Sequence, residues 1–309
     1  MRFLLAGASG FLGTALRVRL AQRGHEVRRL VRSAAIDSSE FYWDPMSGRI
    51  NARALDDVDV IVNLAGPPLF TRPWTAGRRQ YLRDSRIEST RLLAETVVER
   101  YADTEPKPLW VQSSATGWYG TSTELLDRPY DESAPAADDF PGRLAHDWEG
   151  ATAQAVGAGV PVIFIRNGMV LDQCGSTLKL IKPVFALGFG ARLGSGRQRM
   201  SLISLHDWLR AVEFLIDQRR PGPYNLTVPE PPTNAEFTEA LAGQLGRTAR
   251  LAAPGKMLRL ALGELAEQLV DDQYVTPRAL LDLGFSFDGP DVTSTLRLAL
   301  DPHAHLGRA

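Results

Sequence analysis

The chain has 309 residues, of which 44% are hydrophobic, and a formal net charge of −1. This length is ample for a large buried core and long for one small domain. The near-neutral charge gives no electrostatic reason to expect nucleic acid or a membrane surface as a partner, and no segment approaches the roughly 18 uninterrupted apolar residues of a membrane span. Because the single cysteine, Cys174, cannot form an intramolecular disulfide and no secretory signal is recognisable, we expect a cytoplasmic protein.

The first predicted unit is a strand, a glycine turn and a helix. Residues 3–6 form a short apolar run that is typical of a buried parallel strand, and it leads directly into Gly7, Gly10 and Gly13. Residues 14–23 then have helical periodicity. Glycines let backbone N–H groups and the positive end of a helix approach a pyrophosphate, so this turn predicts dinucleotide binding. The spacing is GxxGxxG rather than the common GxGxxG, and a plain tight turn is the alternative.

The end of the second predicted strand indicates which dinucleotide is bound. This strand is expected over 25–31 and is followed by Arg32, with Arg28 and Arg29 close by and no acidic residue before Asp37. An NAD site usually has Asp or Glu at this point to hold the ribose 2′-hydroxyl, whereas a guanidinium donates two hydrogen bonds to phosphate oxygens. We therefore predict NADP(H) as the cofactor, with a solvated arginine as the alternative.

Strand and helix patterns continue to alternate beyond this unit. We expect strands at 59–64, 109–112 and 160–165, and helices at 81–101 and 145–158. This alternation predicts an α/β fold with a doubly wound parallel sheet (Rossmann) and right-handed crossovers. Ligands of such sheets bind beyond the carboxyl ends of the strands. The loops after residues 6, 32, 64, 112 and 165 should therefore line one crevice.

The region after residue 171 has a different composition. Residues 175–200 are rich in glycine, which suits an irregular substrate-side loop or, alternatively, a mobile surface loop. A short strand at 203–205, with Asp207 as the cap of a following helix, and a strand at 224–228 would return the chain to the sheet.

The tail beyond residue 233 is expected to be mostly helical. Pro277 is placed as the first residue of a helix that Gly284 closes. These patterns predict a smaller, mainly helical C-terminal substrate-side region beside the Rossmann core. We assign the NADP-binding core to 1–171 with 201–228 returning to it, and the substrate-side loop and C-terminal helical domain to 172–200 and 229–309.

Two sets of motifs follow one another in order along the chain. The first set is Gly7-x-x-Gly10-x-x-Gly13, Asn63-Leu-Ala-Gly66, Ser113-Ser114-Ala, Tyr119-Gly120 and Arg166-Asn-Gly168. It resembles the extended or atypical short-chain dehydrogenase/reductase superfamily, in its NAD(P)-dependent epimerase/dehydratase branch. The second set resembles a subgroup of that branch, the epimerase family proteins, which carry a small C-terminal domain of unassigned function. It comprises Trp74-Thr75, Ser85-Arg86, Asp147-Trp148-Glu149, Gly168-Met-Val-Leu171 and Leu193-Gly-Ser-Gly-Arg-Gln198.

The resemblance implies roles for individual positions. The glycine loop would hold the pyrophosphate, Arg32 the 2′-phosphate, and residues 64–66 the adenosine ribose side. Ser114 would lie near the nicotinamide, and the segment after Arg166 would brace the carboxamide through its backbone. The implied cofactor-binding residues are Gly7, Ser9, Gly10, Phe11, Leu12, Gly13, Arg32, Leu64, Ala65, Gly66, Ser113, Arg166 and Gly168.

The chain departs from this superfamily at the residues that normally transfer a proton. The superfamily uses a Tyr-x-x-x-Lys pair on one helix face, where the lysine lowers the tyrosine's pKa. None of the four lysines here has a tyrosine four residues before it. On the expected helix, one register puts Leu144 and Trp148 at these places, and another puts Pro141 and Ala145 there.

Several side chains are candidate substitutes, and Ser114 and Tyr119 are our catalytic candidates. Tyr119 could reach the crevice, or it could pack below the cofactor. Ser114 or Thr116 could polarise a carbonyl. His146 could titrate near neutral pH, although a solvated helix face is the alternative reading of its surroundings. No His, Cys or Asp cluster has metal-ligand spacing, so we expect no metal.

Two functions remain open on this basis. The first is an NADP(H)-dependent oxidoreductase or epimerase that acts on a small carbonyl or hydroxyl substrate. The second is an NADP(H)-binding sensor or regulatory protein with little or no turnover, because the fold alone does not determine activity. We expect a small-molecule substrate as partner and neither nucleic acid nor membrane. A homodimer through a pair of helices is possible, but the altered helix at 144–158 leaves it open.

Overall fold

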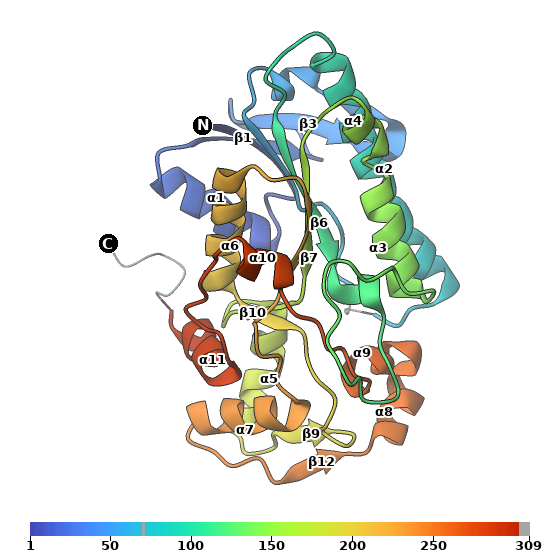
Figure 1. Cartoon of the computed structure of the whole chain (residues 1–309), viewed down its shortest axis with the longest axis vertical. Coiled ribbons are helices and arrows are strands. Elements are labelled where there is room, and N and C mark those ends of the chain that lie inside the picture. The colour runs from blue at the N-terminus through green and yellow to red at the C-terminus, as the bar shows by residue number, and fades with distance from the viewer. Residues whose placement is uncertain (70–71, 303–309) are drawn as a thin grey trace.

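The structure, a computed structural model, describes residues 1–69 and 72–302 of the chain. Its centre is a sheet of eight strands in the order β11-β7-β6-β5-β1-β2-β3-β4 (Figure 1). All neighbours in this sheet are parallel except β3 and β4. The predicted doubly wound parallel sheet is confirmed. The strands are β1 Arg2–Ala6, β2 Glu26–Val31, β3 Glu40–Asp44, β4 Arg49–Ile50, β5 Val60–Asn63, β6 Leu109–Ala115, β7 Val162–Asn167, β8 Met169–Leu171, β9 Ala191–Leu193, β10 Leu202–Ser204, β11 Gly222–Leu226 and β12 Leu251–Ala253.

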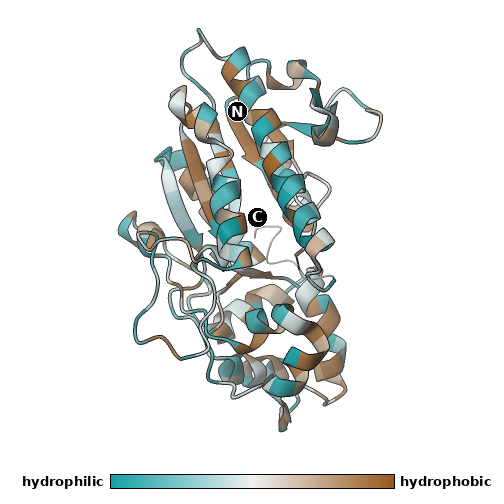
Figure 2. Ribbon diagram, turned by 90° about the vertical axis from the view of Figure 1, so that its right-hand side faces the viewer, coloured by the Kyte–Doolittle hydropathy of each residue, from teal (hydrophilic) through white to brown (hydrophobic). Residues whose placement is uncertain are grey.

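Helices cover both faces of the sheet. On one side lie α1 and α6, and on the other α2, α3 and α4 (Figure 1). Figure 2 turns the right-hand side of Figure 1 toward the viewer and shows hydrophilic residues along the outer surfaces of the long helices there. The helices are α1 Phe11–Gln22, α2 Ala76–Arg100, α3 Phe140–Gly150, α4 Ala153–Gly157, α5 Ser176–Ala186, α6 Leu205–Gln218, α7 Asn234–Gln244, α8 Gly255–Leu262, α9 Glu267–Val270, α10 Arg278–Asp282 and α11 Val292–Leu300.

The sequence of β1 explains why the sheet is buried on both faces. Phe3 and Leu5 belong to the hydrophobic cluster under α1 and α6, whereas Leu4 and Ala6 belong to the cluster under α2 and α4. Side chains alternate between the two faces of a strand, so a continuous apolar run buries both. The strand order reverses at β1, which stands between β2 and β5, and ligands of such sheets bind beyond the carboxyl ends of the strands at this point.

Two predicted helices have other bounds in the structure. The helix expected from residue 81 is α2, which begins at Ala76 after the cap residue Thr75. Its first turn has no large apolar side chain, so periodicity could not reveal it. The helix expected over 145–158 is two helices, because α3 begins at Phe140 after the cap Asp139 and the chain breaks before α4.

The glycine-rich stretch at 175–200 is more ordered than expected, since it contains α5 and β9. The cap of α6 is Ser204 rather than Asp207, whose fully buried carboxylate accepts backbone hydrogen bonds from Asp288 and Gly289.

The remaining corrections concern strand and helix ends. The last strand of the sheet is Gly222–Leu226 instead of 224–228, and Pro277 precedes α10 rather than beginning it. Strands β3 and β4, at the sheet edge, were not predicted at all.

The C-terminal region packs below the sheet in Figure 1. Helices α5, α7 and α11 share a third hydrophobic cluster, which includes Leu178, Phe237 and Leu296. Two small parallel sheets lie outside the main sheet: β8 pairs with β10, and β9 pairs with β12. None of the described helices is long and apolar enough to cross a membrane.

Candidate functional site

The loop between β1 and α1 is shaped by glycines that no other residue could replace without strain. Gly7 has a φ of +79°, and a Cβ there would lie 2.6 Å from the carbonyl oxygen of Leu64. A Cβ at Gly13 would collide with the carbonyl oxygen of Gly7. The loop therefore packs closely against both the first turn of α1 and the end of β5.

The same loop leads into the first turn of α1, whose backbone N–H groups have no partner within the helix. Gly10, the N-cap of α1, donates its N–H to the Gly7 carbonyl oxygen at 3.0 Å and has no side chain to cap the helix. The first-turn N–H groups of a helix, here those of Phe11, Leu12 and Gly13, have no partner within it. Ser9 and Gly10 are exposed. A cradle of this kind fits the pyrophosphate of a dinucleotide.

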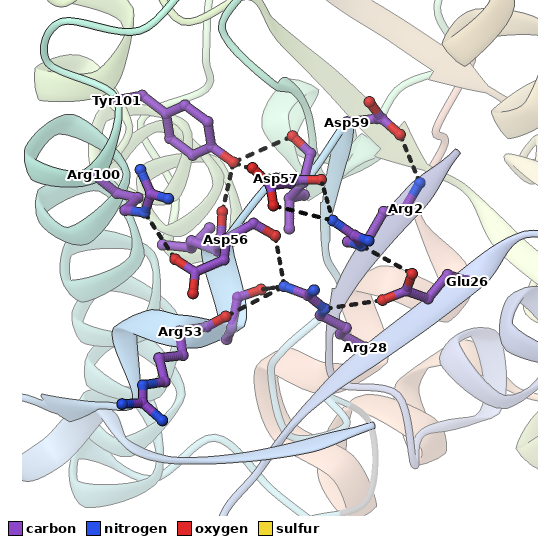
Figure 3. A network of polar contacts seen from close by, with 12 residues as sticks. Arg2, Glu26, Arg28, Arg53, Asp56, Asp57, Asp59, Arg100 and Tyr101 are labelled. Carbon is purple, nitrogen blue, oxygen red and sulfur yellow. Dashed lines mark hydrogen bonds and ion pairs between the residues drawn. The ribbon is translucent and has the colours of Figure 1, made fainter. Parts of the chain in front are cut away.

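Of the three arginines at the end of β2, one is unengaged. Arg28 donates to the backbone oxygen of Asp56 at 2.7 Å within the polar network of Figure 3, and Arg29 pairs with Asp37 at 2.7 Å. Arg32 is exposed and makes no hydrogen bond or ion pair with any residue of 1–69 or 72–302. It is thus free to bind an external anion, and its assignment to a 2′-phosphate stays a prediction.

A buried amide holds the loop after β5, which carries Leu64, Ala65 and Gly66. The Asn63 side chain accepts a hydrogen bond from the Ala65 N–H at 3.1 Å. Its amide nitrogen donates to Thr90 and Gln112, each at 3.0 Å. Asn63 is fully buried, so it fixes the backbone of this predicted cofactor segment from inside.

At the end of β6, the two serines face different partners. The Ser113 hydroxyl accepts a hydrogen bond from the amide of Asn167 at 3.1 Å, and Asn167 in turn accepts one from the Trp208 indole. The Ser114 hydroxyl instead donates to Glu149 at 2.6 Å and is 2% exposed. Because the Ser114 proton already has an acceptor, this side chain cannot polarise a carbonyl in the arrangement shown.

Tyr119 and Arg166 belong to the same buried network. Arg166 forms a bidentate ion pair with Glu149, at 2.9 and 3.0 Å. Its remaining nitrogen donates to the Tyr119 hydroxyl at 2.9 Å, and that hydroxyl donates to Asn225 at 2.8 Å. Burial raises the pKa of Tyr119 to about 12. These contacts favour the packing role for Tyr119, and they engage the Arg166 side chain within the protein.

The face of α3 where the Tyr and Lys would stand is apolar in either register. Leu144, Ala145 and Trp148 are all buried. His146 points to solvent, with two-thirds of its side chain exposed, and lies near Asp147. The solvated-face reading of His146 therefore fits the structure.

Residues 271–276, which we call the strap, tie the β6 loop to the rest of the crevice. Thr116 donates its hydroxyl to the Gln273 side chain at 3.1 Å. The neighbouring Asp272 is almost fully buried and accepts a hydrogen bond from the Leu126 N–H at 2.9 Å. Sequence reasoning missed Gln273, and it also missed Glu149 as the partner of Ser114 and Arg166. Glu149 has no local signal beyond its place in the Asp147-Trp148-Glu149 motif, and Gln273 has none.

Two further features, a cluster of possible metal ligands and a cavity, lie outside the site residues described so far. His206, Asp207 and Asp288 bring ligand atoms within 4.8 Å of one another, but Arg210 already pairs with both carboxylates.

A cavity of about 760 Å³ opens at the first turn of α2, beside Pro67, Pro68, Arg72, Pro73, Thr75, Arg78 and Tyr81. The glycine loop does not line it.

Comparison with known proteins gives two matching family models. Residues 3–143 match the NAD dependent epimerase/dehydratase family, and residues 253–299 match a domain of unknown function, DUF1731. The chain is 42% identical over 285 residues to an epimerase family protein of Mycobacterium bovis, covering 92% of each chain. A crystal structure of human epimerase family protein SDR39U1 with NADPH matches with a TM-score of 0.85 and 30% identity, over 97% of this chain and 99% of that one. A nucleoside-diphosphate sugar epimerase from Corynebacterium glutamicum matches with a TM-score of 0.77 and 30% identity, over 99% of this chain and 58% of that one.

Proposed function

Because the chain belongs to the NAD dependent epimerase/dehydratase family, we propose that it binds NADP(H) and acts as an oxidoreductase or epimerase on a small carbonyl or hydroxyl substrate. The observation that carries this proposal is the glycine cradle with the unengaged Arg32 beside it. The human relative crystallised with NADPH supports the choice of cofactor. When bound, the nicotinamide would supply or accept the hydride.

Several segments of this chain would each bind a different part of the cofactor. Backbone N–H groups of the glycine loop and of the α1 N-terminus would bind the pyrophosphate, and Arg32 the 2′-phosphate. The segment 64–66, shaped by Asn63, would pass the adenosine ribose. Ser113 and the backbone around Gly168 would face the nicotinamide end.

Proton transfer would need a group other than the usual pair. The Ser114, Thr116 and Tyr119 hydroxyls each donate to another side chain. The oxygens of Ser114 and Thr116 can still accept a hydrogen bond, which would orient a substrate hydroxyl, whereas the Tyr119 oxygen already accepts one from Arg166. The proton itself would then come from the substrate or from water.

The second candidate function is an NADP(H)-binding sensor or regulatory protein with little turnover. The apolar face of α3 favours it, since Leu144 and Trp148 stand where the pair would be in one register. A homodimer and a cytoplasmic location remain predictions.

One experiment tests both functions. Purified protein is titrated with NADPH and NADH by fluorescence, and oxidation of bound NADPH is then followed against aldehydes, ketones and quinones. Preference for NADPH with substrate-dependent oxidation would support the enzyme. Tight binding without oxidation by any member of the panel would favour the sensor. Failure to bind either nucleotide would refute both.

A further inference from the structure

The cavity at the first turn of α2 has the size of a small-molecule site. Its volume of about 760 Å³ lies within the roughly 300–1,000 Å³ that is usual for ligand pockets. All of its lining residues belong to the loop after β5 and to the first two turns of α2. None of the residues assigned to the cofactor lines it. The cavity is therefore space next to the predicted cofactor segment 64–66 that the cofactor assignment leaves unused.

The charged side chains that line this cavity are all cations. They are Arg72 and Arg78, and no described aspartate or glutamate lines it. Arg72 is exposed and makes no hydrogen bond or ion pair within residues 1–69 and 72–302. The adjacent Arg79 does not line the cavity and pairs instead with Glu264 of the C-terminal region. Two guanidinium groups in one cavity without a carboxylate favour an anion as its occupant.

Arg78 is held in position on the wall of the cavity. One terminal nitrogen donates to the backbone oxygen of Pro68 at 2.7 Å. The guanidinium carbon lies 5.2 Å from the centre of the Tyr81 ring. A guanidinium that is already ordered loses less conformational entropy when it binds an anion. The cavity thus combines one cation that is fixed in advance with a second, Arg72, that has no partner in the described chain.

The rest of the lining is largely apolar. Pro67, Pro68 and Pro73 line the cavity together with the half-exposed ring of Tyr81. The ring of a proline fixes its φ angle, so three prolines in this short loop limit how far the wall can change shape. A ligand with a negatively charged group on an apolar body would match both the cations and this wall.

The loop that lines the cavity also contacts the C-terminal region. Trp74 packs in one hydrophobic cluster with Leu82 of α2 and with Leu265. Its indole nitrogen donates to the backbone oxygen of Leu69 at 3.0 Å, which ties the loop to itself. The loop thus runs from the predicted cofactor segment to the region that we expect on the substrate side. A subsite for the substrate is expected between two such regions.

We propose that this cavity binds a phosphate group of the substrate, with Arg72 and Arg78 donating to the phosphate oxygens and Tyr81 packing against the body of the molecule. The inference rests on the proposed function and narrows its substrate to a phosphorylated carbonyl or hydroxyl compound. A phosphate monoester carries a charge of about −1.5 to −2 at pH 7, so it matches two cations. Hydrogen bonds between guanidinium and phosphate are charge-assisted and stronger than neutral ones.

The first test compares a phosphorylated compound with its neutral counterpart. Protein saturated with NADPH, which fills the cofactor site, is titrated calorimetrically with glycerol 3-phosphate and with glycerol. Neither compound can oxidise NADPH, so the titration measures binding alone. We expect glycerol 3-phosphate to bind about 100-fold more tightly or better, as two hydrogen bonds between charged groups would give. Equal affinities for the two compounds would overturn the proposal.

The second test locates the phosphate in the cavity. Arg72→Gln and Arg78→Gln should each weaken glycerol 3-phosphate about 10- to 100-fold and leave NADPH affinity unchanged. Arg72→Lys, which keeps the charge, should restore part of the loss. Arg91→Gln is the matched control, at an exposed arginine of α2 that pairs with Glu88. Because Arg72 is exposed and has no described partner, its replacement should not impair folding. Unchanged binding in Arg72→Gln, or an equal loss in Arg91→Gln, would refute the assignment.

Thermal melting separates this inference from the proposed function. If the wild type binds no NADPH, the proposed function fails, and inorganic phosphate becomes the probe. Stabilisation of the wild type and of Arg32→Ala, but not of Arg72→Gln, would still support a phosphate site in the cavity. Equal stabilisation of all three proteins would refute it. If NADPH binds but glycerol 3-phosphate binds no better than glycerol, only the phosphate site fails.

Discussion

The two sides of the crevice are built differently. On the side of β1, the first N–H groups of α1 and the Arg32 side chain have no partners among the described residues. On the side of β6 and α3, the hydroxyls of Ser114 and Tyr119 are buried and bonded to other side chains. Surfaces that await a ligand keep donors unpaired, whereas a structural network satisfies them. The contrast indicates that this protein is organised to bind a dinucleotide, and that proton transfer is not built into the usual place.

The largest effect on stability should follow from a substitution in the buried network on the side of β6 and α3. Glu149→Gln leaves Arg166 buried with no counter-charge, so we expect the free energy of unfolding to fall by about 3–5 kcal/mol. Urea denaturation measures this, with the exposed Glu95→Gln as the control. A loss below about 1 kcal/mol, the ordinary value of a single hydrogen bond, would show that the β6 side is not held by this pair.

The next largest effect, on NADPH affinity, should come from a side chain that blocks the glycine loop. Gly10→Val keeps an extended backbone that any residue can adopt, at φ −74° and ψ 172°, but puts a branched side chain where the pyrophosphate would approach. NADPH affinity should drop about 100-fold or more, because the backbone can no longer come close. The melting temperature should fall less than the affinity does, since Gly10 is exposed and the new Cβ would meet only the Gly7 carbonyl oxygen, at 3.3 Å. Retained affinity would place the cofactor elsewhere.

A finer test of the binding side concerns its selectivity. Arg32→Ala should weaken NADPH about 10- to 100-fold, as expected for a lost bond between charged groups, and hardly affect NADH. Arg49→Ala, at an exposed arginine of the edge strand β4, serves as the control. Equal losses for NADPH and NADH would remove Arg32 from the 2′-phosphate site.

The smallest effect is expected at Tyr119. Tyr119→Phe should lower the free energy of unfolding by about 1–2 kcal/mol through lost hydrogen bonds, with NADPH affinity unchanged. Folding raises the pKa of Tyr119 from its usual 10.0 to about 12. The wild type should therefore keep this stabilisation below pH 10 and lose it as the pH rises toward 12, a change that the variant lacks.

A turnover measurement tests the alternative role of Tyr119, which is catalysis. If a substrate is found and Tyr119→Phe abolishes its conversion at unchanged NADPH affinity, the β6 side is catalytic after all. The comparison between the two sides would then need to be revised.

The sequence indicated the conformation of the glycine loop but not the contacts on the β6 side, for a physical reason. The glycine loop is a local pattern in which strand, turn and helix follow one another, so Gly7 and Gly13 could be assigned from spacing alone. Arg32 was likewise readable from its distance to that loop. Which of the neighbouring arginines is free depends on tertiary partners such as Asp56, and no local pattern shows these.

The residues that sequence reasoning missed depend on distant contacts. Glu149 gains its importance from Arg166, on another strand, and Gln273 from Thr116, far along the chain. The early start of α2 and the edge strands β3 and β4 escaped notice because their sequences lack a clear apolar period. Arg86 belongs to one of the sequence motifs. Only the structure shows that this buried arginine forms no ion pair within the described part of the chain.

The strap has a consequence for how the protein acquires its crevice. Thr116 and Gln273 meet although 157 positions separate them in the chain. Contacts between such distant positions form late, because a long loop must first be closed. During synthesis, the N-terminal strands can pair while the β6 loop still lacks its tether. We therefore expect the dinucleotide cradle to mature before the substrate end does, and a chain that stops short of the strap to bind nucleotide more readily than substrate.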